Sequence, residues 1–229
     1  MLSVNEIQVS YGQSVVIRNM SFQAAKGEIV GIVGRNGMGK TTLFRSLIGM
    51  LPLRSGKITL DGTDISREES YNRVGHGLAI VPQGRMIFPY LTVYENLVSG
   101  AATPISEEEV SEIYALFPVL RDMKNRKGGN LSGGQQQQLA IGRALMTRPK
   151  VLLLDEPTEG IQPSIIKDIA RTLKEIRSLK NLTIVVSEQV LSFMLEVCDR
   201  LFVIEKGSLV REDLRSSVDA EEIRKMLSV

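Results

Sequence analysis

Several features that define whole classes of protein are missing from this chain. It has one cysteine, Cys198, so no internal disulfide can form, and the apolar residues around it predict a buried, unreactive thiol in a reducing compartment. Its 28 lysines and arginines nearly balance 26 aspartates and glutamates, and a formal charge of +2 does not indicate nucleic acid as the main partner. No apolar run is long enough to span a membrane, and residues 1–6 lack the basic and apolar regions of a signal peptide. We therefore expect a soluble, cytoplasmic protein.

The chain does have the material for a large core. Its 229 residues are 43% hydrophobic, which is enough for one large domain or two small ones. No internal repeat or disordered linker stands out.

A glycine-rich loop at residues 34–42 organises the chain. It follows an apolar run, Ile29–Val33, and precedes residues 43–48, whose apolar side chains have helical spacing. The order strand, glycine loop, helix fits the P-loop pattern, in which backbone N–H groups and the positive end of a helix dipole bind a nucleotide phosphate. The alternative, a glycine-rich turn that ends in Lys-Thr by chance, is rare in a chain of this length.

The loop supplies the candidate phosphate-binding residues. Among them, the Lys40 ammonium is expected to reach the β and γ phosphates, and the Thr41 hydroxyl is expected to bind Mg²⁺. The full set is Gly34, Arg35, Asn36, Gly37, Met38, Gly39, Lys40, Thr41 and Thr42.

The N-terminal quarter of the chain predicts an antiparallel β layer. Strand-like patterns cover residues 4–10, 15–17, 20–24 and 55–60, with turns between them. Tyr11 follows the first of these strands, where its ring could stack on a nucleotide base, although core packing is the simpler explanation of a single tyrosine.

The middle of the chain changes from strand to helix. After a short polar helix near residues 66–73, residues 78–81 predict a buried strand, and the next loop carries Gln83, whose amide could reach a metal ion or a water molecule. From Thr92 to about Met146 the pattern is helical, with Thr92 and Ser106 as N-caps. The acidic run at residues 107–109 is best explained as an exposed first helical turn and not as a metal site.

A second candidate anion site lies within this helical stretch. A basic loop at residues 124–130 leads into Leu131-Ser132-Gly133-Gly134-Gln135, which opens a helix at residues 136–146. Ser132 can cap that helix, and the two glycines expose backbone N–H groups that could meet a phosphate.

Two carboxylates end the continuous apolar run at residues 151–154. Such a run is typical of a central parallel strand, whose carboxyl end faces a binding site. Asp155 suits a water-mediated contact with Mg²⁺, and Glu156 suits polarising a water molecule against the γ-phosphate, although two acids after a strand can also cap a helix. Residues 183–186 predict another strand, with Gln189 beyond it on the same side. The rest predicts a helix at 163–179, a hairpin at 200–212 and a helix at 220–227.

Together, the loop at residues 34–42, the segment Leu131–Gln135 and Leu-Leu-Leu-Asp-Glu-Pro at residues 152–157 resemble the ATP-binding subunit of ABC transporters. The resemblance covers nearly the whole chain. It implies an α/β fold, a P-loop NTPase core with a parallel central sheet and an N-terminal antiparallel β layer. It also implies one domain at residues 1–229, with a helical subdomain inserted at about residues 92–146. The expected cofactors are ATP and Mg²⁺, with hydrolysis of ATP to ADP and phosphate coupled to solute import.

The resemblance also gives roles to single residues. Tyr11 resembles the aromatic residue that stacks on the base, and Gln83 resembles the glutamine that senses Mg²⁺ and the membrane partner. Asp155 and Thr41 would hold Mg²⁺ with Gln83, and Glu156 would be the general base.

The signature Ser132, Gly133, Gly134 and Gln135 would act in trans. It would close over ATP held by the P-loop of a second ATPase subunit, a paralogue or a second copy, in a head-to-tail dimer. Each site lacks donors around the γ-phosphate until the helix start of the partner arrives, so a monomer is expected to hydrolyse ATP poorly.

One position departs from the family. Its members usually place a histidine just after the strand that contains Val186, but Gln189 stands there, and the only histidine of this chain is His76. An amide can hydrogen-bond the γ-phosphate but carries no positive charge, so Gln189 is assigned the catalytic position with weaker transition-state stabilisation. This substitution resembles the ATPases of branched-chain amino-acid importers. The segment at residues 155–163 is most similar to their urea and short-amide subgroup.

These resemblances imply a peripheral subunit at the cytoplasmic face of the inner membrane that powers import of urea or a short amide. Its partners would be the second ATPase subunit, two membrane-spanning permease subunits and, indirectly, a periplasmic or extracellular solute-binding protein, with no nucleic acid. Three alternatives stay open. They are a branched-chain amino-acid importer, a non-transport ABC ATPase, which would need a coiled-coil insertion or a second P-loop that this sequence lacks, and a nucleotide-binding module without turnover.

Overall fold

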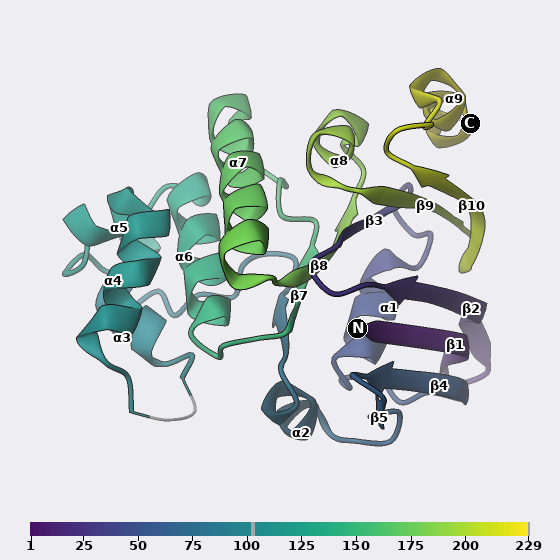
Figure 1. Cartoon of the computed structure of the whole chain (residues 1–229), viewed down its shortest axis with the longest axis horizontal. Helices are drawn as coiled ribbons and strands as arrows, with labels where there is room; N and C mark the ends of the chain where they lie inside the picture. The colour runs from purple at the N-terminus through teal and green to yellow at the C-terminus, as the bar shows by residue number, and fades with distance from the viewer. Residues whose placement is uncertain (102–103, 229) are drawn as a thin grey trace.

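A computed structural model describes residues 1–101 and 104–228 of the chain (Figure 1). Its strands are β1 Leu2–Tyr11, β2 Ser14–Ala24, β3 Ile29–Val33, β4 Ser55–Leu60, β5 Thr63–Asp64, β6 Leu78–Val81, β7 Val151–Asp155, β8 Thr183–Glu188, β9 Arg200–Glu205 and β10 Ser208–Leu214. Its α-helices are α1 Lys40–Leu47, α2 Ser70–Gly75, α3 Val93–Val98, α4 Glu107–Leu116, α5 Pro118–Asp122, α6 Gly133–Leu145, α7 Pro163–Lys180, α8 Leu191–Val197 and α9 Ala220–Ser228.

The smaller sheet is the antiparallel layer that the sequence predicted, with the strand order β2-β1-β4-β5. The prediction of two strands at residues 15–17 and 20–24 was wrong, because both belong to the single strand β2. Asn19 has a left-handed backbone, with φ of 44°, and the pairing of β1 with β2 shifts register between Ile7 and Val9. A bulge of this kind breaks the alternation of side chains without ending the strand, so the pattern resembles two strands.

The larger sheet has the order β10-β9-β3-β8-β7-β6, in which every neighbouring pair is parallel except β9 and β10. Strands β3 and β7 are buried along their whole length, as expected of strands covered on both faces. The carboxyl ends of β3, β6, β7 and β8 therefore lie at one edge, where parallel sheets bind ligands.

Helix α1 lies between the two sheets (Figure 1). Its side chains Leu43, Phe44 and Leu47 are fully buried in the core that the small sheet shares with the large one. Helices α6, α7 and α8 contribute to a second core against the other face of the large sheet. The loop before α1 is thus held between two packed layers.

Arg73 of α2 closes the C-terminal end of α1. Arg73 is 1% exposed, and its guanidinium donates to the carbonyl oxygens of Ser46 and Leu47 at 2.8 and 2.7 Å, and to those of Ser66 and Glu68 at 2.9 Å. Burial lowers the pKa of this arginine. A cation at this position complements the negative end of the helix dipole.

The stretch at residues 92–146 contains helices and no named strand among its described residues. The predicted caps Thr92 and Ser106 each form a capping box with the glutamate three residues later. Two helix starts were misplaced: α6 begins at Gly133 and not at residue 136, because Ser132 caps it, and α2 begins at Ser70 and not near residue 66. The sequence pattern gave no separate bounds for the short helices α5 and α8.

None of the described helices is long and apolar enough to cross a membrane.

Candidate functional site

A cavity of about 320 Å³ lies where the P-loop meets the loops after β6 and β7. It combines glycines of the loop, a lysine, two threonine hydroxyls, two side-chain amides and a carboxylate. Its lining is Val16, Asn36, Gly37, Gly39, Lys40, Thr41, Thr42, Gln83 and Glu156. Residues that are more than 100 positions apart in the sequence thus face one space, as predicted for the carboxyl edge of the sheet.

The P-loop ends at an open helix start. Gly39 is the N-cap of α1 with φ of 107°, a backbone conformation that side-chain-bearing residues rarely adopt. Among the described residues, no side chain caps the first turn of α1, which also has no acidic residue. Its N–H groups and the positive end of the dipole therefore suit an external anion.

The ammonium of Lys40 contacts both the P-loop backbone and the carboxylate of Glu156. Its ammonium donates to the carbonyl oxygens of Gly34 at 2.7 Å and Arg35 at 2.9 Å, and it lies 3.1 Å from Oε1 of Glu156. Lys40 is 4% and Glu156 8% exposed, so this ion pair is almost shielded from water. The pair gives each buried charge a partner, which burial requires.

Three polar side chains converge on Glu156. Besides Lys40, Gln83 donates to Oε2 of Glu156 at 3.3 Å, and Gln189 Nε2 lies 3.5 Å from both of its oxygens. The backbone of Glu156 is left-handed, with φ of 50°, so its side chain is held in an uncommon direction by the surrounding contacts.

Gln189 also reaches the P-loop. Its Nε2 donates to Oδ1 of Asn36 at 2.7 Å, a much shorter contact than those to Glu156. Gln189 therefore lies between the phosphate-binding loop and the Glu156 carboxylate.

Asp155 lies at the end of β7, 3% exposed. Burial raises the pKa of its carboxyl, while hydrogen bonds from Ser187, at 2.6 Å, and from Thr41 act in the opposite direction. The described residues contain no group of three or more acidic, histidine or cysteine side chains that could hold a metal ion by themselves. A hydroxyl, an amide and one carboxylate fit Mg²⁺, which takes several of its ligands from substrate phosphates and water.

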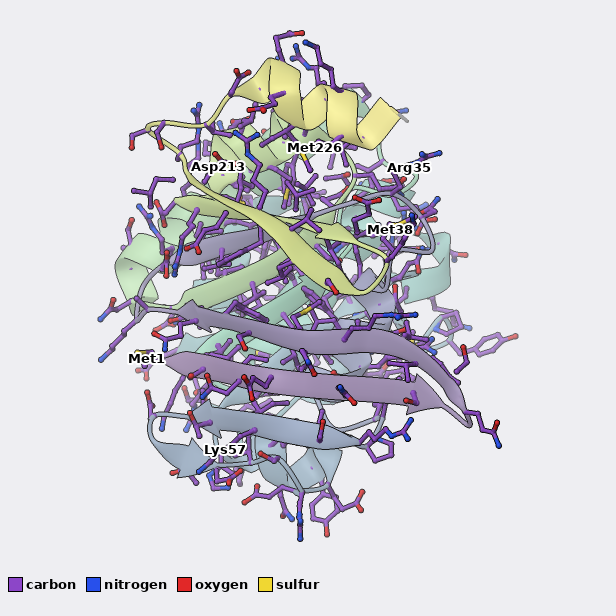
Figure 2. The ribbon with its side chains drawn as sticks, turned by 90° about the vertical axis from the view of Figure 1, so that its right-hand side faces the viewer. Met1, Arg35, Met38, Lys57, Asp213 and Met226 are labelled. Atoms are coloured by element: carbon purple, nitrogen blue, oxygen red, sulfur yellow. The ribbon has the colours of Figure 1, made fainter. Side chains whose placement is uncertain are left out.

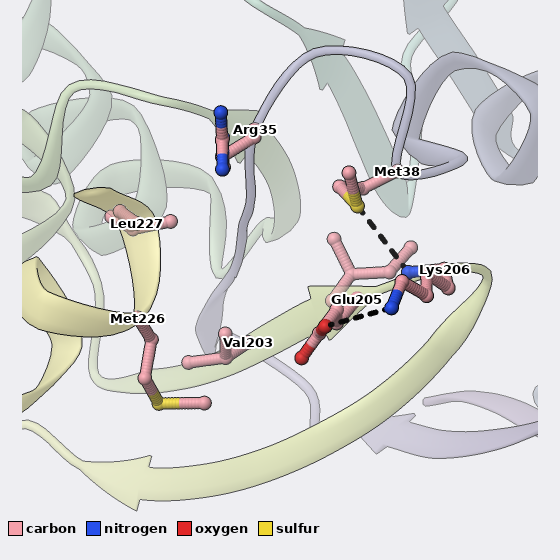
Figure 3. Close-up of a pocket in the computed structure, with 8 residues that line it drawn as sticks. Arg35, Met38, Val203, Glu205, Lys206, Met226 and Leu227 are labelled. Atoms are coloured by element: carbon pink, nitrogen blue, oxygen red, sulfur yellow. Dashed lines mark hydrogen bonds and ion pairs between the residues drawn. The ribbon is translucent and has the colours of Figure 1, made fainter. Parts of the chain in front are cut away.

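Two P-loop side chains point away from this cavity. Arg35 and Met38 line a second cavity, of about 370 Å³, between the P-loop, β9 and α9 (Figures 2 and 3). The Met38 sulfur accepts a hydrogen bond from the backbone N–H of Lys206 at 3.3 Å, and the N–H of Gly207 donates to the Met38 carbonyl oxygen at 3.0 Å. Arg35 and Met38 can therefore serve a phosphate through their backbone and not through these side chains.

The predicted base-stacking residue and the signature lie apart from the P-loop cavity. Tyr11, at the end of β1, is 46% exposed and is not part of the cavity lining. The signature residues 132–135 are likewise outside that lining, at the start of α6, which lies across the large sheet from α1 (Figure 1). The Ser132 side chain accepts from the N–H of Gln135 at 3.4 Å, and Gln135 Oε1 accepts from the N–H of Ser132 at 2.9 Å.

Sequence reasoning gave no role to two residues that order the site. Ser187 donates to Asp155, and Arg85 donates to the carbonyl oxygen of Glu159 at 2.7 Å, which connects the loop of Gln83 to the turn after Glu156. A serine inside an apolar strand is a visible signal for the first. The second contact joins loops 74 positions apart and has no local signal.

The model of the ABC transporter family matches residues 17–159. The chain is 38% identical over 216 residues to the high-affinity branched-chain amino acid transport ATP-binding protein BraG of Pseudomonas aeruginosa, covering 93% of this chain and 92% of BraG. It is 34% identical over 215 residues to the lipopolysaccharide export system ATP-binding protein LptB of Haemophilus influenzae, covering 91% of this chain and 88% of LptB. The solved structure of MJ1267, an ATP-binding cassette of an ABC transporter, superposes with a TM-score of 0.84 at 30% identity, covering 100% of this chain and 95% of that one.

Proposed function

The chain belongs to the ABC transporter ATP-binding family and is an ATP-hydrolysing subunit, and from this premise we propose that it powers the import of urea or a related short amide. The observation that carries the proposal is the segment Gly160-Ile161-Gln162-Pro163, which begins four residues after Glu156 and resembles the urea subgroup of the branched-chain amino-acid importers. Gln189 in place of the usual histidine supports the same branch of the family. BraG, a 38% identical relative, is named as a branched-chain amino acid transport protein.

We assign the chemistry to residues that surround the P-loop cavity. The backbone of residues 34–42 and the start of α1 bind the phosphates of ATP, and Lys40 leaves Glu156 to pair with the β and γ phosphates. Glu156 then accepts the proton of the attacking water, while Gln83 and Gln189 hold that water and the γ-phosphate in line. Thr41, Gln83 and Asp155 would hold Mg²⁺, which would supply positive charge to offset the phosphate oxygens.

The exposed start of α6 supports a site that is completed by a second subunit. Ser132 and Gly133 are not buried, and they are outside the lining of the P-loop cavity of their own chain. A head-to-tail dimer would bring this helix start to the γ-phosphate of the partner and add donors there. Whether the second subunit is a paralogue or another copy, the arrangement makes turnover depend on assembly.

A groove beside the Gln83 loop suits the membrane-spanning partner. A cavity of about 290 Å³ lies between the loop at residues 85–88, β6 and α6, with Met86, Phe88 and Arg143 in its lining. Met86 is 63% and Phe88 49% exposed, and Tyr71 and Tyr90 are 74% and 84% exposed. Several exposed large apolar side chains in this part of the chain are typical of an interaction site, and Gln83, two residues from Arg85, would report its occupation to the nucleotide.

A branched-chain amino-acid importer is the second candidate, because BraG matches over 93% of this chain. The match to LptB, named for lipopolysaccharide export, extends the family likeness to an exporter. The core chemistry is common to all three, so the solute has to be tested directly.

The test is uptake of labelled urea and labelled leucine by cells of the source organism that lack this chain. We expect urea uptake to be lost, leucine uptake to continue, and the wild-type chain to restore urea uptake. Glu156→Gln should not restore urea uptake, and Glu175→Gln, at an exposed position, is the matched control for a glutamate-to-glutamine change. Loss of leucine uptake with normal urea uptake would replace the proposal by the second candidate.

A further inference from the structure

Glu188 is a buried carboxylate to which the chemistry above assigns no role. It is the last residue of β8, next to Gln189, and it is 3% exposed. Among the described residues, no lysine, arginine or histidine nitrogen lies within 4 Å of it to form an ion pair. A buried charge without a counter-ion is costly unless fixed hydrogen-bond donors replace the water that it has lost.

Four donors surround this carboxylate. Its Oε1 accepts from the N–H of Thr158 at 2.8 Å and from the Thr158 hydroxyl at 2.5 Å. Its Oε2 accepts from the N–H of Gln189 at 2.8 Å and from the N–H of Val190 at 3.3 Å. Three of the four donors are backbone groups whose direction the chain fixes. One side chain therefore binds two different loops.

One of these loops determines where Glu156 lies. Thr158 is two residues after Glu156, and the N–H of Glu159 closes the turn by donating to the Glu156 carbonyl oxygen at 3.2 Å. The left-handed backbone of Glu156 is a strained conformation that persists only where the neighbouring chain is held. Glu188 holds it through Thr158, on the far side of the turn.

The other loop carries Gln189. Because the side chain of Gln189 contacts Glu156 only at 3.5 Å, those contacts by themselves fix its position weakly. The carbonyl oxygen of Glu188 also accepts from the N–H of Gly34, the first residue of the P-loop, at 3.2 Å. Glu188 thus touches the start of the phosphate loop, the turn after Glu156 and the backbone of Gln189.

We infer that Glu188 is a positioning residue for ATP hydrolysis: its carboxylate fixes the turn of Glu156 and the backbone of Gln189 in one arrangement. The inference depends on ATP turnover by the family and not on which solute is transported. Its effect acts through the placement of the other two residues, since Glu188 is not part of the P-loop cavity lining.

The isosteric change Glu188→Gln has an asymmetric effect. A glutamine has one acceptor oxygen and one NH₂ group, so one of the two loops must face a donor. Facing Gln189 and Val190, the NH₂ group would leave two backbone N–H groups without an acceptor. Facing Thr158, it leaves only one, because the threonine hydroxyl can rotate and accept. Glu188→Gln is therefore expected to release the Thr158 turn and keep the Gln189 loop.

The test measures kcat, KM and direct nucleotide affinity in the assembly in which the wild-type chain turns over ATP. We expect Glu188→Gln to lower kcat by about 10- to 100-fold, since a misplacement on the order of 1 Å can cost that much, with nucleotide affinity within about threefold. Thr158→Val should lower kcat by a smaller factor, again with little change in nucleotide affinity. Thr158→Ser, which keeps the hydroxyl, should turn over ATP like the wild type. The double variant Glu188→Gln/Thr158→Val should be no worse than Glu188→Gln, because both act through one contact. The pH dependence of kcat should keep its shape.

Ile176→Val, in the core of α7, controls for stability that is lost without any contact to these loops. A lower melting temperature with kcat within twofold of wild type would make Glu188 a purely structural residue and overturn the inference. So would a parallel loss of nucleotide affinity, which would mean that Glu188 acts through Gly34. If Glu188→Gln does not fold, the Thr158 pair decides: equal kcat for valine and serine would overturn the inference. A wild-type subunit that hydrolyses ATP without supporting urea uptake leaves this test unaffected.

Discussion

The starts of α1 and α6 both offer backbone N–H groups, but they differ in whether a side chain caps the helix and in whether the helix start faces the P-loop cavity. Both follow a glycine-containing loop and offer backbone N–H groups to an anion. At α1 no side chain among the described residues caps the helix, and Lys40 and Glu156 fill the charged positions within the same chain. At α6 the cap Ser132 and Gln135 satisfy each other, and the helix start lies away from the P-loop cavity.

The difference indicates that nucleotide binding and ATP hydrolysis depend on different helix starts. Under the proposed mechanism the α1 side would bind the phosphates of a nucleotide within one chain, so binding would be a property of the monomer. The α6 side would offer donors to a neighbouring subunit, so hydrolysis would be a property of the assembly. Variants of the two sides should therefore separate binding from turnover.

Glu156→Gln should have the largest effect. It removes the proton acceptor, so turnover should fall by roughly 10²- to 10⁴-fold. Nucleotide binding should persist or tighten, because Lys40 is released from its ion pair, and the dimer should stay closed on ATP. Steady-state hydrolysis and size-exclusion chromatography with ATP measure both results. Undiminished hydrolysis would remove Glu156 from this role, and Glu175→Gln is the matched control.

A matched pair of variants contrasts the two helix starts directly. Lys40→Met should weaken ATP binding by the isolated subunit by roughly 10- to 150-fold, from about 1.5–3 kcal/mol for a charged hydrogen bond. Ser132→Ala should leave that affinity unchanged and lower turnover of the assembly by roughly 2- to 30-fold, from about 0.5–2 kcal/mol for a lost helix cap. Calorimetric titration of the lone subunit and hydrolysis by the assembly are the two measurements. A weaker ATP affinity of the lone Ser132→Ala subunit would contradict the division.

The smallest expected effect concerns the stability of the fold. Without Mg²⁺ and nucleotide, Asp155→Asn should stabilise the chain slightly. Burial raises the pKa of Asp155 above its unfolded value of 3.8, so the ionised carboxylate opposes folding at neutral pH. Below pH 3.8 the group is protonated in both states, and its cost disappears. In EDTA and without nucleotide, Asp155→Asn should therefore raise stability by on the order of 1 kcal/mol, or ~2–4 °C in melting temperature. The gain should shrink as the pH falls through the folded pKa towards 3.8. An equally stable or less stable variant at neutral pH would show that the hydrogen bonds from Ser187 and Thr41 outweigh burial.

Local patterns were sufficient for the fold class and for placing the P-loop and the acids at the end of β7 at one edge of the large sheet. Strand, glycine loop and helix adjoin one another at residues 29–48, and the acids at 155 and 156 end their own strand, so adjacency in sequence is adjacency in space. Parallel strands then bring the separate motifs to one edge, which the apolar runs predicted.

Long-range contacts account for what the sequence could not predict. The Met38 side chain turns away from the cavity because the hairpin at Lys206, 168 residues later, offers its N–H. The role of Glu188 depends on Thr158, 30 positions earlier, and a glutamate at the end of a strand has no pattern that indicates such a partner. The two short strands predicted in place of β2 failed for a local reason, because a bulge at Asn19 imitates a turn.

The contact of Arg73 with α1 has a mechanical consequence. The phosphates of ATP are expected at the first turn of this eight-residue helix, and the guanidinium of Arg73 is bound to its last carbonyl groups. Arg73 belongs to α2, whose Val74 lines the groove proposed for the membrane partner. A displacement of α2 by a partner bound in that groove would therefore be transmitted to the C-terminal end of α1 through the buried side chain of Arg73. In this arrangement ATP and the membrane partner would act on the two ends of one short helix.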